Sequence, residues 1–276
     1  MALTNFIPQL WSGALLAHLD KAHVVANLVN RNYEGMIRQA GDTVIINQLG
    51  DITVKDYVEN TDVEAPEDLS TTKKTLTIDK QKYFNFQIDD VEKAQGAGNL
   101  MDAAMQRAAY ALADETEKII LTAIDTDAAN KLAPVAALDE TNIYKELVKV
   151  KVAMDKKNVP SQGRWLVVSP DTHALLLQDT RFVATGGSMA EETLRNGFIG
   201  RVLGFDVYLS NNLSTLTNGN AAIAGVNMAV TFAEQIVETE AYRMEKRFSD
   251  AVKGLNVFGV KVIYPDCLVC LKSTPS

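Results

Sequence analysis

The stretch that decides the fold is Thr75-Leu-Thr-Ile-Asp-Lys-Gln-Lys-Tyr-Phe-Asn-Phe-Gln-Ile-Asp89. Apolar side chains alternate with polar ones near both of its ends, which is the period of a β-strand with one buried face. At about 3.3 Å per residue, the stretch spans roughly 45 Å when extended. A compact chain of 276 residues has a diameter of roughly 50 Å. A strand of this length therefore cannot stay within the body without crossing all of it.

The middle of the stretch indicates where the chain leaves the body. Lys80 and Lys82 occupy positions where the pattern set by Leu76 and Ile78 predicts apolar side chains. Only the last third of the stretch then carries an apolar face suited to a core. With the alternating residues from Thr43 onward as its first strand, the segment is predicted to form a long antiparallel hairpin whose outer part projects as an arm.

A two-stranded arm is marginally stable in water by itself, and its open edges offer pairing sites to another chain. Two interpretations follow: a solvated, mobile loop, or an arm that lies across a neighbouring copy. The second predicts contacts between copies through the charged residues of the arm. These residues are Asp62, Glu64, Glu67, Asp68, Lys73, Lys74, Lys80 and Lys82.

The rest of the chain mixes helices and strands, which predicts an α+β fold. Residues 10–30 have apolar side chains at helical spacing. Residues 100–124 contain no glycine or proline and predict one helix of roughly 37 Å. A further helix is predicted at 143–156 and a short apolar strand at 164–169, and the pattern from 236 to 271 is mostly extended.

The composition limits the chemistry of the chain. Its 27 basic and 35 acidic residues give a formal net charge of −8, which disfavours binding to a phosphate backbone. Cys267 and Cys270 lie in an apolar, β-rich stretch without the second ligand pair that a zinc site needs. We therefore predict two buried thiols and no catalytic, cofactor-binding or metal site, and we expect neither a targeting segment nor a membrane span.

One acidic cluster leaves a minor enzymatic alternative. Asp89, Asp90 and Glu92 follow the long strand closely. Because successive strand residues point to opposite faces, these carboxylates do not obviously converge on one substrate. A hydrolase that uses these three residues is the alternative from a different functional class.

The order of these elements resembles the major capsid proteins of tailed bacteriophages, which have the Hong Kong ninety-seven-type capsid fold. Local sequences are similar as well. Residues 1–12 look like the start of many phage coat proteins, and residues 42–57 look like the first part of their hairpin. Residues 199–213 and 254–262 look like strands of their apical and peripheral domains.

The resemblance implies four parts: an N-terminal arm (1–42), an extended hairpin (43–90), a peripheral domain with a long spine helix (91–140 and 234–276) and an α/β apical domain (141–233). It implies a structural protein, not an enzyme, that self-assembles in the host cytoplasm into an icosahedral virion head. The implied partners are other copies in hexamers and pentamers, portal and scaffolding proteins, and packaged double-stranded DNA by proximity alone. An encapsulin-like nanocompartment shell is the alternative within the same fold.

Overall fold

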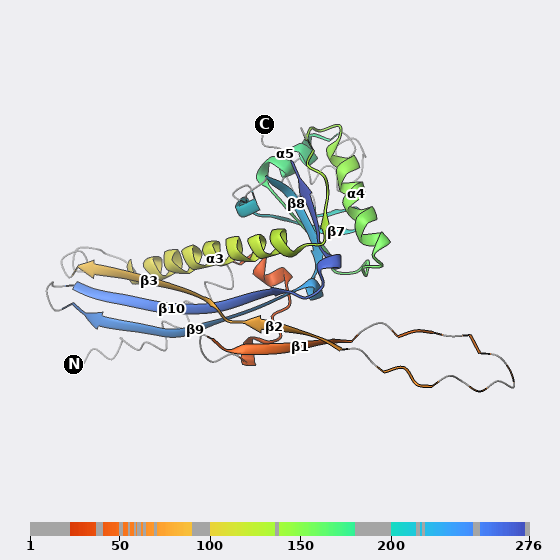
Figure 1. The fold of residues 1–276 in the computed structure, drawn as a ribbon. Coiled ribbons are helices and arrows are strands. Elements are labelled where there is room, and N and C mark those ends of the chain that lie inside the picture. The colour runs from red at the N-terminus through yellow and green to blue at the C-terminus, as the bar shows by residue number, and fades with distance from the viewer. Residues whose placement is uncertain are drawn as a thin grey trace.

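The computed structural model is an α+β fold whose described residues form three β-sheets, of two, three and six strands (Figure 1). The described residues are 23–36, 41–49, 71–89, 100–135, 138–179, 200–213, 216, 219–244 and 249–273, with single positions or short runs between 52 and 68.

A three-stranded antiparallel sheet and one long helix form an elongated part of the body. The strands are, in spatial order, β3 (Lys80–Asp89), β10 (Ser249–Val262) and β9 (Val230–Arg243). Helix α3 (Leu100–Asp127) lies along this sheet (Figure 1), and small side chains such as Ala109 join a buried cluster with Val252 of β10. Gly254 leaves room for an aromatic ring, since a Cβ there would lie 2.4 Å from the ring of Phe84.

A six-stranded sheet and two helices form the second part of the body. The strands are, in spatial order, β4 (Asn130–Lys131), β11 (Val269–Lys272), β8 (Asn220–Val226), β5 (Arg164–Val168), β7 (Phe205–Leu209) and β6 (Arg201–Val202). Helices α4 (Ile143–Lys156) and α5 (Pro170–Gln178) contact each other and lie against β11 and β8, respectively. Every residue of β5 and β8 is buried, as expected for central strands covered by helices.

The single strand predicted across residues 75–89 is two strands in different sheets. The two-stranded sheet consists of β1 (Thr43–Leu49) and β2 (Thr71–Thr77), which are antiparallel. The chain changes sheet at Ile78, whose side chain is buried with that of Leu76 in a cluster that includes Val257 of β10. The expected hairpin at 43–90 therefore contains β3, a strand of the body, and only its earlier part projects (Figure 1).

The helices predicted at 100–124 and 143–156 are confirmed, the first with three more residues at its end. The extended pattern predicted after residue 236 is also confirmed, as β9, β10 and β11. However, β11 belongs to the six-stranded sheet, whereas the range 234–276 was expected to accompany the long helix. A 3-10 turn at Pro265–Cys267 separates β10 from β11 at this change of sheet.

The N-terminal part differs from the helix predicted over residues 10–30. Residues 1–22 lie outside the described residues, and the next ones form a 3-10 turn, Ala26–Leu28, and a bridge between Asn30 and Thr231. Backbone hydrogen bonds to β9 on both sides of this bridge replace those of a helix. Further 3-10 turns lie at Glu34–Met36, Asn211–Leu213 and Asn227–Ala229.

Candidate assembly surfaces

The base of the β1–β2 hairpin is fixed to the body by backbone contacts. The N–H of Gly41 donates to the carbonyl of Ile78 at 2.9 Å, and the N–H of Ile78 donates to the carbonyl of Asp42 at 3.0 Å. Strand β10 passes so close that a Cβ on Gly259 would lie 2.3 Å from the carbonyl oxygen of Thr77. Packing against β10 therefore determines the direction in which the hairpin leaves the body.

The two faces of the hairpin have different surroundings. Ile46 of β1 and Leu76 of β2 are buried against the body, whereas Ile45 is 59% exposed on the opposite face. The side-chain amide of Gln48 donates to the carbonyl of Ile263 at 3.0 Å, which adds a contact to the body. The outward face thus offers apolar surface next to a firmly held base.

Beyond β1, the connection between the two strands carries large apolar side chains in solvent. Ile52, Val54 and Tyr57 are 70%, 92% and 73% exposed. The two limbs of the connection are joined by Thr53, whose backbone N–H and hydroxyl donate to the carboxylate of Glu67 at 3.2 and 3.3 Å. A row of exposed apolar side chains on a projecting segment is typical of an interaction surface.

The charged residues predicted to contact another copy fall into two groups. Those farther from the body are exposed, namely Asp62, Glu67, Asp68 and Lys73. Glu64 lies outside the described residues. The exposed members are available for contacts between copies, and that role stays a prediction.

The other three lysines have partners in their own chain. The Nζ of Lys82 lies 3.3 Å from the carboxylate of Glu115 on α3, and this hydrogen bond is the main reason that the pKa of Glu115 is lowered. Lys80 pairs with Asp79 at 3.0 Å, and Lys74 donates to a backbone carbonyl just after β10. A contact with another copy would therefore have to share or replace these partners.

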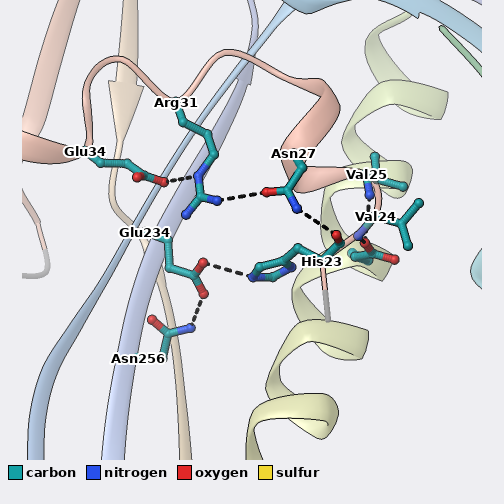
Figure 2. Close-up of polar contacts among 9 residues, drawn as sticks. His23, Val24, Val25, Asn27, Arg31, Glu34, Glu234 and Asn256 are labelled. Atoms are coloured by element: carbon teal, nitrogen blue, oxygen red, sulfur yellow. Dashed lines mark hydrogen bonds and ion pairs between the residues drawn. The ribbon is translucent and has the colours of Figure 1, made fainter. Parts of the chain in front are cut away.

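Figure 2 shows a buried polar cluster that no pattern in the sequence predicted. The Nε2 of His23 donates to the carboxylate of Glu234 on β9 at 3.1 Å, and the amide of Asn256 on β10 donates to the same carboxylate at 2.6 Å. The carboxylate of Glu117 on α3 accepts two backbone N–H groups, that of Val25 at 2.7 Å and that of the preceding residue. The segment that starts at residue 23 is thus fastened to both the helix and the sheet.

Burial raises the pKa of Glu117, although the two N–H donors counteract the shift. Further polar contacts continue along the segment: the amide of Asn27 donates to the carbonyl of His23 at 2.8 Å, and Arg31 donates to Asn27 at 3.0 Å and to Glu34 at 2.6 Å (Figure 2). The buried contacts join residues 92 and 211 positions apart. No local spacing in the sequence could have indicated them.

A pocket of about 180 Å³ lies between α3, Val24 and the residues that follow β7. Its walls include the carboxylates of Asp114 and Glu117. Asp114 pairs with Lys118 at 2.7 Å, which lowers the pKa of Asp114, and Glu117 already accepts two backbone hydrogen bonds. Both carboxylates are engaged in structural contacts, so the pocket does not present them as a free acid–base pair.

The described residues hold no group of three or more His, Cys, Asp or Glu side chains arranged for a metal ion. Both cysteines are free, and burial raises the pKa of Cys270 to about 12, whereas a reactive thiol needs a lowered pKa. The carboxylates of Asp89, Asp90 and Glu92 lie outside what the structure describes. None of the described helices is long and apolar enough to cross a membrane.

Comparisons with known proteins point in one direction. The model of a family described as phage capsid protein matches residues 72–271. A solved structure from Mycobacterium phage Che8 is 31% identical in sequence, with a TM-score of 0.75, over 90% of this chain and 90% of that chain. No curated protein matches the chain.

Two more distant structures share the fold. The capsid structure of the cyanophage P-SCSP1u is 17% identical, with a TM-score of 0.71, over 92% of this chain and 87% of that chain. The crystal structure of a virus-like particle from Pyrococcus furiosus is 14% identical, with a TM-score of 0.61, over 96% of this chain and 98% of that chain. The likeness therefore extends over both parts of the body.

Proposed function

Because the chain belongs to the phage capsid protein family, and is therefore a major capsid protein of phage heads, we propose that its copies close into an icosahedral shell through contacts made by the projecting hairpin. A major capsid protein is a structural component of the virion that associates with copies of itself, not an enzyme. The observation that carries the proposal is the exposure of Ile52, Val54 and Tyr57 on a segment held firmly at its base.

We assign the parts of the chain by sheet membership. The peripheral domain consists of α3, the spine helix, with the three-stranded sheet β3-β10-β9, and the apical domain consists of the six-stranded sheet with α4 and α5. The extended hairpin is β1, β2 and their connection, and the N-terminal arm is residues 1–42. These boundaries move β3 out of the hairpin, and β4 and β11 into the apical domain.

The hairpin of one copy is proposed to lie over the next copy in each capsomer. Its outward face supplies apolar contacts through residues such as Ile45 and Val54. Charged contacts come from the predicted residues of the hairpin, Asp62, Glu64, Glu67, Asp68, Lys73 and Lys74, and from Lys80 and Lys82 at the start of β3. Each surface salt bridge between copies contributes little, about 0–1 kcal/mol. Stable assembly therefore depends on the apolar contacts, and the charges select orientation and partner.

Further partners follow from this role. Hexamers and pentamers of the chain form the shell, a portal and a scaffolding protein take part in its assembly, and packaged double-stranded DNA lies nearby. The net charge of −8 supports a wall that does not bind the genome tightly.

Electron microscopy of the purified full-length chain tests the proposal. The wild type should form closed shells of uniform size, and Ile52→Ser/Val54→Ser should leave a folded chain that forms far fewer shells, because both side chains are largely exposed. Met228→Ser, which also removes an exposed apolar side chain, is the matched control and should assemble normally. A wild type that stays monomeric both alone and when co-expressed with the scaffolding protein would refute the proposal.

The encapsulin-like alternative has one observation in its favour, the fold shared with the virus-like particle from Pyrococcus furiosus. The higher sequence identity to the structure from a phage favours the phage head. Mass spectrometry of purified shells separates the two, because a nanocompartment would contain a cargo enzyme and a phage head would contain DNA.

A further inference from the structure

Helix α4 presents a row of basic side chains to solvent. Lys145, Lys149 and Lys156 are exposed, and with Val152 they follow a spacing of four, three and four residues. This spacing places all four on one face of the helix, opposite the buried face that carries Met154. The row is about 17 Å long, from 1.5 Å per residue.

Most of this charge is not neutralised within the chain. Lys149 pairs with Glu146 at 2.7 Å, although its side chain is still 63% exposed. Lys145 interacts electrostatically with Asp139, just before the helix, and contributes to the lowered pKa of that carboxyl. Among the residues that the structure describes, neither Lys145 nor Lys156 lies within 4 Å of a carboxylate. Between them, Val152 is 42% exposed. The row therefore combines exposed positive charge with a central apolar contact.

The connection between β1 and β2 has the opposite character. Residues 50–70 contain seven acidic residues and one lysine, so this segment accounts for six of the eight net negative charges of the chain. Its described acidic residues are all exposed: Asp56, Glu59, Asp62, Glu67 and Asp68. The exposed Ile52, Val54 and Tyr57 lie in the same segment. The connection thus combines negative charge with apolar side chains.

From these two surfaces we infer that the acidic connection of one copy lies on the basic row of α4 in a second copy. In Figure 1, α4 and the described residues of the connection in one chain lie well apart, and the connection points out of the body, so the pairing is between copies. Opposite charges attract the two surfaces and fix their register, and Val152 meets the apolar residues of the connection. This inference rests on the proposed shell function and names the partner surface of the hairpin.

Charge reversal on the full-length chain tests the inference. Lys145→Glu/Lys156→Glu should fold normally, because both side chains are exposed, and should give about tenfold fewer shells, since like charges that face each other cost several kcal/mol. Adding Glu59→Lys/Asp62→Lys to the same chain restores opposite charges across the contact. The fourfold variant should recover shells, although each pair of changes alone impairs assembly.

The matched control is Arg107→Glu/Lys131→Glu, which reverses two exposed basic residues outside the row and should assemble like the wild type. If the wild type forms no shells, the proposed function fails. If the wild type, the control and the α4 variant all form shells in equal yield, only the α4 contact is refuted. The α4 contact is also refuted if the α4 variant forms normal shells that no longer protect DNA from nuclease, because the basic row would then face the genome.

Discussion

Replacing Gly259 by alanine tests how the hairpin is held at its base. A Cβ at this position would lie 2.3 Å from the carbonyl oxygen of Thr77, 2.9 Å from Cδ1 of Ile78 and 3.1 Å from the carbonyl carbon of Thr77. Two of these three atoms belong to the backbone, which cannot turn away as a side chain can. The change therefore forces β10 and the end of β2 apart at the point where the chain changes sheet.

The size of the effect follows from the distances. An ordinary contact of a Cβ begins at 3.4 Å, so the carbonyl oxygen must move by about 1 Å. Overpacking of this kind costs about 1–3 kcal/mol. For a chain of this size each kcal/mol lowers the melting temperature by about 2–4 °C, so Gly259→Ala should melt about 2–12 °C below the wild type.

Thermal unfolding followed by circular dichroism, with all proteins in the same buffer and assembly state, measures this difference. Gly35→Ala is the matched control, because a Cβ at Gly35 has no neighbour within 4 Å and should change stability by no more than about 0.5 kcal/mol. Electron microscopy should also find fewer shells for Gly259→Ala, since the hairpin leaves the body in a shifted direction. Equal melting temperatures for the two variants would refute the close-packing argument.

Four further predictions concern charged groups that the structure places. Glu117→Ala should lower the free energy of unfolding by about 1–3 kcal/mol, because the buried N–H of Val25 loses its acceptor. Thermal unfolding measures this loss, and an unchanged melting temperature would contradict the structural role of Glu117. The second prediction compares the wild type with Glu117→Gln. As the pH falls from the raised pKa of Glu117 toward the usual value of 4.5, the wild type should gain stability relative to this variant, because only the folded state binds the proton in that window. A stability difference between the two proteins that does not vary with pH would be contrary evidence. Arg164→Met should lower the free energy of unfolding by about 2–3 kcal/mol. The buried guanidinium of Arg164 donates to the carbonyls of Val159 and Pro160 and to the carboxylate of Asp155, at 2.6–2.8 Å. Arg201→Met, which removes an exposed ion pair, should cost about 1 kcal/mol or less. Lys80→Glu/Lys82→Glu should keep the fold, because the half-exposed ion pair between Lys82 and Glu115 contributes about 1 kcal/mol or less. The same variant should form fewer shells in electron microscopy. A yield of shells equal to that of the wild type would argue against a role for these lysines in assembly.

Local patterns in the sequence predicted most of the elements but not their partners, and they predicted a helix through residues 23–30, where the chain makes a 3-10 turn and a bridge to β9. The glycine- and proline-free run over 100–124 and the apolar spacing over 143–156 predicted α3 and α4 well, because helical hydrogen bonds are made within the segment itself. Strand alternation indicates which residues share a face, and it does not say which strand lies alongside. The period of two therefore continues through Ile78 while the chain passes from one sheet to another.

The buried polar cluster could not be predicted for a related reason. His23 and Glu234 are ordinary polar residues in the sequence, and only the fold brings them together in the interior. Glu117 lies on a helix where the nearby Asp114 and Glu115 both pair with Lys118 at the surface. A burial of this kind is a property of the packed body, and the composition of the helix carries no sign of it.

The contacts of the hairpin with its own chain are concentrated at its base. The outer part of the hairpin is therefore the part that needs a neighbouring copy to cover it. At the base, Leu76 and Ile78 are fully buried and backbone hydrogen bonds fix the chain to the body. Farther out, among the described residues, Thr53 and Glu67 join the two limbs, while apolar side chains remain in solvent. A two-stranded ribbon of this kind is marginal by itself, so a covering neighbour adds apolar burial where the single copy has least. The stability of this region then depends on the concentration of the chain.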